Sequence, residues 1–449
     1  MSRKNKSEGF AKPVAIGVQR LTLAFVLLAG CILLPRSQAQ TFSVIYGFTG
    51  GTGGSGPSGQ LLLDASGNLF GGVNSGGDLS CNKPFGCGLI FKLDSSGTLT
   101  VLHTFSDAED GSEPFGNMVS DASHNLYGTT AAGGDVNLVC TPGEKPTGCG
   151  VAFKLNTLTG KFTVLHRFAG GASDGSEPNG LIRDEAGNLY GTTFLGGNAG
   201  CGSSNGSCGI LYKIDPTGKF TLLYSFTGGA DGGLPINAVR DKAGNLYGTT
   251  INGGDLNCES NPGTGPGCGT VFEFTTAGAL KVLHTFTGGQ DGADNAGAIG
   301  VSEAGLIQNS AGNLLGVAPF GGHRECKSYP GCGVVYRVST AGKETILHAF
   351  TGGSDGSMPD YGLTSDSAGN LYGTTVQGGD TSGICNPLGC GTVFKLDLDN
   401  QLTTLYSFTD GADGLYPSFL TSDASGNLYG VAQSGYAQSP GGVIFKITQ

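Results

Sequence analysis

The sequence contains no tryptophan and few charged residues, which make up 13% of the chain. Basic residues are the scarcer kind, because 24 Lys and Arg stand against 35 Asp and Glu, a formal net charge of −11. A negative surface argues against DNA, RNA or an anionic membrane as a partner. The lack of tryptophan disfavours a sugar-stacking groove, although Tyr361, Tyr416 and Tyr436 offer other aromatic rings.

Long apolar runs are also missing, with one exception near the N-terminus. The run from Leu21 to Leu34 follows a basic start and is too short to span a bilayer comfortably. Ser37-Gln38-Ala39 then offers small residues to a signal peptidase. We therefore predict that residues 1–39 are a signal peptide, that no transmembrane helix follows, and that the protein is secreted, periplasmic or displayed on the cell surface.

A second processing site competes with this one. Leu28-Ala29-Gly30-Cys31 has the form of a bacterial lipobox, which would make the protein a lipoprotein anchored at Cys31. The apolar run continues past Cys31, so we favour the cut after Ala39. This cut leaves 18 of the 24 basic residues and 34 of the 35 acidic residues, a formal charge of −16.

Glycine, in contrast, is abundant at 84 of 449 residues, and its placement is periodic. The string GNLYG or a close variant recurs seven times, with asparagines at positions 68, 125, 188, 245, 313, 370 and 427. The spacings are 57, 63, 57, 68, 57 and 57 residues, so the fold is to be read from one repeat of that length. The glycines therefore indicate turns rather than a disordered chain.

Each repeat predicts four short strands. Around Asn188 these are NGLIRD, LYGTT, ILYKID and KFTLLYSF, connected by the turns EAGN and PTG and by a glycine-rich loop. Seven four-stranded antiparallel sheets in series are typical of a seven-bladed β-propeller, an all-β fold, which would form a single domain over residues 40–449. A β-helix or an array of sandwiches is the alternative.

The two ends of the chain complement each other. The third strand of the repeat occurs seven times and ends with VIFKIT at the C-terminus, whereas the fourth begins with TFSVIYGF at the N-terminus, before any third strand. The last sheet therefore lacks its outermost strand, and the N-terminus carries one strand too many. We predict that this strand completes the last blade and closes the ring, which removes two exposed sheet edges.

The repeat resembles the GloVer (Gloeo-Verruco) tandem repeat of exported bacterial proteins. The resemblance covers residues 41–449 and rests on P-x-x-x-L-x-x-D-x-x-G-N-L-Y-G-T-T-x-x-G-G, then C-G-x-V-F-K-L, then T-x-L-H-x-F-T-G-G-x-D-G. NHL-type propeller repeats are similar in strand order, but more distantly. The resemblance implies an exported, surface-type protein with a C-terminal anchoring tail, although this sequence stops at Gln449 directly after a strand. It carries over no catalytic residue.

Twelve of the thirteen cysteines form one pair per repeat, in the loop between the second and third strands, and the thirteenth is Cys31. The pairs are Cys81–Cys87, Cys140–Cys149, Cys201–Cys208, Cys258–Cys268, Cys326–Cys332 and Cys385–Cys390. In an exported protein such local pairs predict six disulfides. A metal site is the alternative, but it needs about four converging ligands and each loop brings two thiols.

An Asp-Gly pair recurs in the loops that lead from one blade to the next. The aspartates are Asp110, Asp174, Asp231, Asp291, Asp355 and Asp413. In a propeller these loops share one face with the cysteine loops, and we predict that any binding site lies on this long-loop face. The aspartates are candidate Ca²⁺ ligands. Asp-Gly is also a common turn sequence, and we favour the interpretation that these aspartates only stabilise turns.

Glu113 and Glu177 are candidate acid–base groups, although we favour the interpretation that they are solvent-exposed turn residues.

Four of the six histidines occupy one position of the repeat, on the outermost strand, which tyrosine fills in the other blades. They are His103, His166, His284 and His348. Because they would be spread around the rim, we expect them to pack between blades. His323, Arg324 and Glu325 instead break the repeat in the fifth cysteine loop, and they are our candidate ligand-binding residues.

These features predict a monomeric exported propeller that binds an unknown extracellular or envelope ligand. We expect a non-catalytic binding or cell-envelope scaffold module with no cofactor other than a possible Ca²⁺. The alternative is a Ca²⁺-dependent hydrolase or lyase with its site at the channel mouth on the long-loop face. An enzyme would show clustered, non-repeating polar residues there, whereas these loops repeat with mostly Gly, Ser, Asp and Pro.

Overall fold

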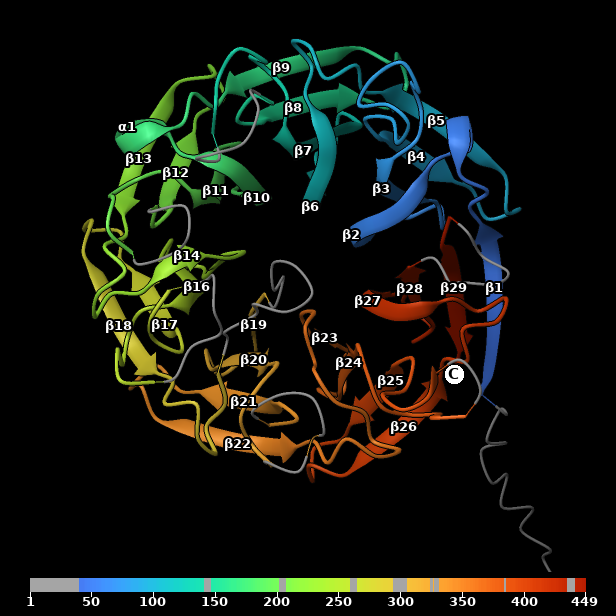
Figure 1. Ribbon diagram of the computed structural model, residues 1–449, viewed down its shortest axis with the longest axis vertical. Helices are drawn as coiled ribbons and strands as arrows, with labels where there is room; N and C mark the ends of the chain where they lie inside the picture. Colours follow the sequence, from blue (N-terminus) through green and yellow to red (C-terminus); the bar gives the residue numbers. More distant parts are fainter. Residues whose placement is uncertain are drawn as a thin grey trace, which may run out of the picture. The chain divides into compact units, whose positions relative to one another are not determined.

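The computed structural model describes residues 40–140, 147–201, 207–258, 265–293, 305–323, 326, 331–382, 385–433 and 441–449. All of them belong to the unit Gln40–Gln449. Their strands form seven antiparallel sheets that lie as blades around a central axis (Figure 1). The predicted seven-bladed β-propeller is therefore confirmed.

The first four blades follow each other along the chain, each from its innermost to its outermost strand. Blade 1 holds β2 (Ser55–Leu63), β3 (Leu69–Ser75), β4 (Leu89–Leu93) and β5 (Leu99–Thr104). Blade 2 holds β6 (Ser112–Ser120), β7 (Asn125–Ala132), β8 (Val151–Asn156) and β9 (Phe162–Arg167). Blade 3 holds β10 (Ser176–Arg183), β11 (Leu189–Leu195), β12 (Ile210–Ile214) and β13 (Phe220–Ser225). Blade 4 has its innermost strand in two pieces and holds β14 (Gly233–Pro235), β15 (Val239–Arg240), β16 (Leu246–Asn252), β17 (Thr270–Phe274) and β18 (Leu280–Thr285).

The last three blades complete the ring. Blade 5 holds β19 (Ile307–Gln308), β20 (Leu314–Ala318), β21 (Val334–Val338) and β22 (Glu344–Ala349). Blade 6 holds β23 (Thr364–Ser365), β24 (Leu371–Thr375), β25 (Thr392–Leu396) and β26 (Leu402–Ser407). Blade 7 holds β27 (Leu415–Ser422), β28 (Leu428–Gln433), β29 (Val443–Thr448) and, outermost, β1 (Thr41–Gly47). Short helical turns lie in the loops, at η1 (Gly51–Gly53) and α1 (Gly171–Asp174).

The seventh blade combines the two ends of the chain. β1 pairs antiparallel with β29, so that Thr41 lies opposite Thr448 and Gly47 opposite Val443 (Figure 1). The backbone N–H of Phe48 extends the contact by donating a 2.9 Å hydrogen bond to the carbonyl of Gly442. The predicted closure of the ring is confirmed.

The core lies between blades. The phenylalanine that follows each outermost strand packs edge-on against an aromatic ring on the third strand of the next blade, at 5.2–5.7 Å between ring centroids. The pairs are Phe48–Phe91, Phe105–Phe153, Phe168–Tyr212, Phe226–Phe272, Phe286–Tyr336, Phe350–Phe394 and Phe408–Phe445. Every ring is buried, so each blade is stabilised mainly by its neighbours.

The repeated Asp-x-x-Gly-Asn turn joins the two innermost strands of a blade. In blade 3, Asp184 accepts hydrogen bonds from the backbone and side chain of Asn188, both at 2.8 Å, and from the hydroxyl of Tyr190 at 3.1 Å. Gly187 adopts φ 86°, a left-handed conformation that favours glycine. The aspartate therefore holds the turn on which the repeat pattern depends.

These turns are expected to make the protein acid-sensitive. Burial raises the pKa of Asp184, but the hydrogen bonds from Asn188 and Tyr190 outweigh it and hold the pKa below 3.8. The pKa of Asp184 is lower in the folded state than in the unfolded state. The turn therefore adds stability at pH values above the pKa of the unfolded state, and this stability is lost as the pH falls through the pKa of the folded state. We expect the urea midpoint to fall as the pH is lowered below about 4, the usual pKa of an aspartate. Asp184→Asn, which copies Asn309 of blade 5, should reduce this slope, and an unchanged slope would contradict the explanation.

Candidate functional site

Six disulfides close the loops between the second and third strands of blades 1 to 6. They join Cys81 to Cys87, Cys140 to Cys149, Cys201 to Cys208, Cys258 to Cys268, Cys326 to Cys332 and Cys385 to Cys390. The predicted pairing is confirmed. Disulfides of this number are consistent with a protein outside the cytoplasm.

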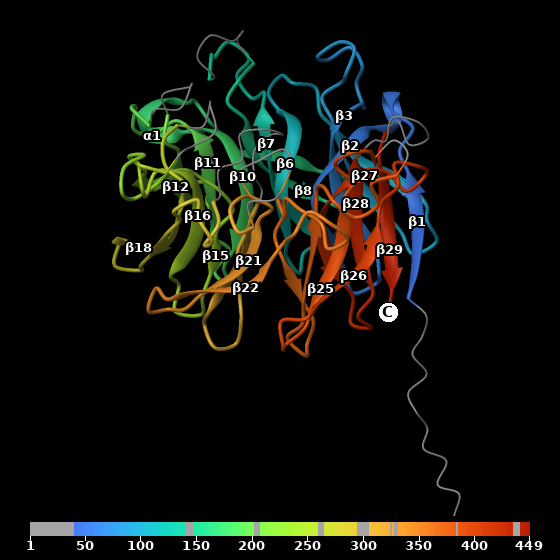
Figure 2. The ribbon, with the colours of Figure 1, turned by 60° about the horizontal axis from the view of Figure 1, so that its bottom comes forward.

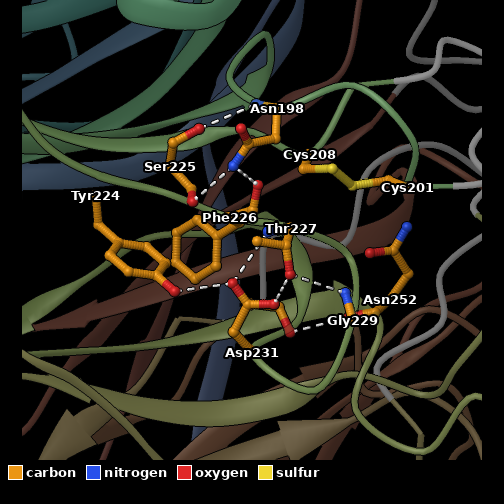
Figure 3. The surroundings of a disulfide bond; sticks show 11 residues. Asn198, Cys201, Cys208, Tyr224, Ser225, Phe226, Thr227, Gly229, Asp231 and Asn252 are labelled. Atoms are coloured by element: carbon orange, nitrogen blue, oxygen red, sulfur yellow. Dashed lines mark hydrogen bonds between the residues drawn. A yellow bond between two sulfur atoms is a disulfide. The ribbon is translucent and has the colours of Figure 1, made fainter.

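Each disulfide packs on the loop that leads to the next blade. In blade 3, a Cβ added to Gly228 would lie 2.5 Å from Sγ of Cys201. The side-chain amide of Asn198 donates to the carbonyls of Ser225 and Phe226, at 3.1 and 3.0 Å, and so ties the cysteine loop to the end of β13 (Figure 3). Gly288 and Gly352 make the equivalent close approaches in blades 4 and 5. The two kinds of loop therefore form one packed layer at one end of the strands (Figure 2).

A second contact, a backbone hydrogen bond, connects five of the cysteine loops to the next blade. A proline recurs where the chain enters the innermost strand of a blade. The residue before this proline adopts a left-handed φ of 51–57° and donates its backbone N–H to the carbonyl of the second cysteine of the preceding blade. The five described pairs are Glu113–Cys87, Glu177–Cys149, Leu234–Cys208, Met358–Cys332 and Tyr416–Cys390, at 2.8–3.1 Å. The candidate acid–base residues Glu113 and Glu177 thus share a structural position with Leu, Met and Tyr.

In five of the six Asp-Gly pairs, the aspartate accepts hydrogen bonds from a side chain on the outermost strand of its own blade and from the loop that follows that strand. In blade 3, Asp231 accepts hydrogen bonds from the hydroxyl of Tyr224 at 2.9 Å, from the backbone N–H of Thr227 at 3.0 Å, and from the Thr227 hydroxyl (Figure 3). Burial, together with the hydrogen bond to Asp231, raises the pKa of Tyr224 to about 12, so the phenol stays a donor. Both carboxylate oxygens are therefore occupied within the loop.

The same arrangement repeats around the rim with His or Tyr as the partner. The distances are 3.0 Å for His103–Asp110, 2.6 Å for His166–Asp174, 3.3 Å for His348–Asp355 and 3.1 Å for Tyr406–Asp413. A one-residue β-bulge precedes the His or Tyr in all seven outermost strands, and a bulge re-aims the side chain that follows it. The histidines also pack between blades as expected, since His103 stacks on Phe162 at 3.9 Å.

Sequence reasoning missed this pairing, although a signal was present. His or Tyr precedes the aspartate by seven residues in five blades and by eight in blade 2. The structure places the six aspartates at the outer strands of six different blades and does not bring them together. Their assignment as Ca²⁺ ligands stays a prediction.

Removal of one such carboxylate is expected to destabilise the protein. Asp231→Ala leaves the Tyr224 hydroxyl and the Thr227 N–H without their acceptor, at a cost of about 1–3 kcal/mol in the free energy of unfolding. Urea unfolding with and without Ca²⁺ measures it. If Ca²⁺ raises the midpoint of the parent protein but not of Asp231→Ala, the carboxylate is a cation ligand as well as a turn residue.

Large apolar side chains are exposed on the cysteine loops. They are Leu79 and Phe85 in blade 1, Val136 and Val139 in blade 2, and Leu256 in blade 4. Phe85 is the most exposed of them, at 65%. Five of the ten large apolar side chains that are exposed in the described residues lie on these loops, and the sequence analysis did not single them out.

Of the three residues that break the fifth cysteine loop, the structure describes one. His323 is exposed, and its backbone carbonyl accepts a 3.0 Å hydrogen bond from Cys332 N–H. Arg324 and Glu325 lie outside the described residues, as does Tyr436. The ligand-binding assignment of this loop stays a prediction.

Two clefts open on the opposite face, between neighbouring blades. One, of about 530 Å³, lies between blades 7 and 1 and is lined by the turns at Asp64 and Asp423. The other, of about 470 Å³, lies between blades 5 and 6 near Asp366. Their carboxylates already hold the tight turns described above, so we do not assign the site to them.

Polar residues of the innermost strands join blades to one another. The buried amide of Asn179 donates to Thr192 Oγ1 at 3.2 Å and to the carbonyl of Pro235 in blade 4 at 3.0 Å. Oδ1 of Asn117 accepts from the backbone N–H of Gln60 in blade 1 at 3.0 Å. These hydrogen bonds therefore connect the innermost strands of neighbouring blades in the part of the chain that the structure describes.

No helix among those residues has the length and apolar character needed to cross a membrane.

The fold and its loops define a disulfide-bonded β-propeller of tandem repeats. The profile of the Gloeobacter/Verrucomicrobia repeat matches residues 138–382 and 302–449, more than half of the chain. The chain belongs to this repeat family, as its sequence resemblance indicated. No curated protein matches the sequence.

Solved structures with the same fold include two lyases. Virginiamycin B lyase from Staphylococcus aureus aligns with a TM-score of 0.55 and 13% identity over 91% of this chain and 99% of its own. Oligogalacturonate lyase from Vibrio parahaemolyticus aligns with a TM-score of 0.52 and 12% identity over 91% and 96%. At such identities the likeness concerns the fold alone.

Proposed function

We propose that this protein is an exported binding module of the cell envelope that engages its ligand through the long-loop face. The observation that carries the proposal is the set of exposed apolar side chains on the cysteine loops. The described parts of these loops are held by disulfides and by backbone hydrogen bonds to the next blade, which supports a preformed binding surface. Preorganisation of this kind lowers the entropy cost of binding.

The export route is part of the proposal. Cleavage after Ala39 would place the new N-terminus one residue before β1 begins at Thr41. Lipidation at Cys31 is the alternative, and it would leave a short tether between the membrane and the ring. Mass spectrometry of the mature protein distinguishes them, because a diacylglyceryl group on Cys31 contradicts cleavage after Ala39.

Substitution of the exposed side chains tests the binding face. The triple variant Phe85→Ser, Val139→Ser and Leu256→Ser should lose at least about tenfold in affinity for sacculi or envelope membranes from the producing cells. The control is Leu158→Ser with Leu398→Ser, because these side chains are 73% and 70% exposed in the tight turns of the opposite face. If the control loses as much affinity as the triple variant, the long-loop face is not the binding surface.

An enzymatic role is the competing proposal, with Ca²⁺-dependent hydrolysis or elimination at the channel mouth. Turnover assays with oligosaccharides, lactones and cyclic peptides, with and without Ca²⁺, separate the two. The binding proposal expects no turnover, whether Ca²⁺ is present or removed. Sustained turnover that depends on residues of the long-loop face would replace it.

A further inference from the structure

The boundary between blades 4 and 5 holds a cluster of metal-ligating side chains. Nε2 of His284 on β18 lies 3.5 Å from Oε2 of Glu344 on β22 and 3.7 Å from Oδ2 of Asp291 in the loop after β18. One ligand atom from each residue lies within 4.8 Å of the other two. All three side chains are largely buried, with 13–17% of each exposed. The other described cluster, Cys81 and Cys87 with Asp107, contains a disulfide and offers no thiolate.

Glu344 distinguishes this boundary from the other six. The equivalent position of the outermost strand is apolar in every other blade: Phe42, Leu99, Phe162, Phe220, Leu280 and Leu402. There the apolar side chain packs against the His or Tyr of the preceding blade, as Phe220 does against His166 at 4.3 Å. A carboxylate in an apolar slot is costly unless a cation compensates it.

The distance between the histidine and the aspartate also differs at this boundary. The equivalent pairs in blades 1, 2 and 5 are hydrogen-bonded at 3.0, 2.6 and 3.3 Å, whereas His284 and Asp291 stand 3.7 Å apart. Nε2 of His284 and Oε1 of Glu344 are buried and make no hydrogen bond to any described residue. Two ligands of a tetrahedral ion with bonds of about 2.0–2.1 Å lie about 3.3–3.5 Å apart. The 3.5 Å between His284 and Glu344 falls in this range, and the 3.7 Å between His284 and Asp291 lies slightly beyond it.

We propose that His284, Asp291 and Glu344 bind one divalent transition-metal ion, Zn²⁺ in the first place, which joins blade 4 to blade 5. One imidazole nitrogen and two carboxylate oxygens are ligands that Zn²⁺ accepts, and the two carboxylates balance its charge. The imidazole disfavours Ca²⁺ and Mg²⁺, because these ions take oxygen ligands. A water molecule completes the coordination. The site lies on the outer strands and does not depend on what the long-loop face binds.

Isothermal titration of the purified, oxidised protein with Zn²⁺ tests the proposal. We expect one ion per chain, with a rise in the melting temperature on saturation. Glu344→Leu copies the residue of blades 1, 4 and 6, and His284→Tyr copies that of blades 3, 6 and 7. Each of these two variants should raise the Kd for Zn²⁺ at least about tenfold. Loss of a residue that only hydrogen-bonds to a metal ligand already costs about that much, and loss of the ligand itself should cost no less.

His348→Tyr is the matched control, because its neighbour at the next boundary is the apolar Leu402. This variant should bind Zn²⁺ as the parent does, and His323→Ala should too, which excludes the exposed histidine. Glu344→Gln keeps the size of the side chain and should also lose the ion, which separates ligation from packing. The proposal is overturned if the parent shows no saturable binding, or if Glu344→Leu and Glu344→Gln bind as tightly as the parent.

Discussion

Deletion of residues 41–48 is expected to unfold the ring rather than trim it. Without β1, the edge of β29 loses its backbone partners, and Phe42 no longer stacks on Tyr406 at 3.7 Å. The contact of Phe48 with Phe91 in blade 1 is lost as well, so blades 7 and 1 separate. We expect a loss of at least about 5 kcal/mol, comparable to the whole stability of many domains. Thermal unfolding by circular dichroism measures it.

Single substitutions show whether the deletion acts through the loss of specific contacts that close the ring or only through the shortening of the chain. Phe48→Ala removes a side chain that is 2% exposed and should cost about 3–5 kcal/mol, whereas Val44→Ala, on the exposed side of β1, should cost about 0.5 kcal/mol or less. A synthetic peptide of residues 40–50 should restore the melting temperature of the deletion variant. A deletion variant as stable as the parent would refute closure by this strand.

The closure could be predicted because it follows from counting. The third strand occurs seven times and so does the fourth, but the first copy of the fourth comes before any third strand, and antiparallel sheets leave one way to combine them. The disulfides could be predicted for a similar reason, because a local pair in each loop needs no knowledge of distant contacts. Period and spacing therefore settled the architecture.

The contacts of individual side chains could not be predicted in the same way. His103 and Asp110 fall in different parts of the repeat, and a one-residue bulge after Val101 decides that His103 turns toward the carboxylate. Likewise, the meeting of His284 with Glu344 depends on how two blades pack, which no spacing within a repeat encodes. A comparison of repeats position by position would have marked Glu344, since it stands alone among phenylalanines and leucines. That comparison was the unused signal.

Reduction of the six disulfides is expected to have the second large effect. Each closes a short loop, with sequence separations from 5 to 10 residues, and contributes roughly 2–2.7 kcal/mol in the loop-entropy model. The second cysteine of five loops also accepts a hydrogen bond from the next blade, so loosening the loop weakens the boundary between blades. We expect the melting temperature to fall by about 10 °C or more when all six are reduced.

The boundary between blades 7 and 1 provides the internal control. There, Gly56 N–H donates a 3.0 Å hydrogen bond to the carbonyl of Gly441, in the position that a cysteine carbonyl takes elsewhere, with no disulfide in the loop. Hydrogen exchange after reduction should therefore accelerate at Glu177 and Leu234, whose acceptors are Cys149 and Cys208, well before it does at Gly56. A matched variant, Cys201→Ser with Cys208→Ser, should confine the acceleration to the boundary of blades 3 and 4. If reduction, verified by thiol counting, leaves both the melting temperature and these exchange rates unchanged, the disulfides do not support the joints between blades, and the aromatic pairs between blades carry the ring alone.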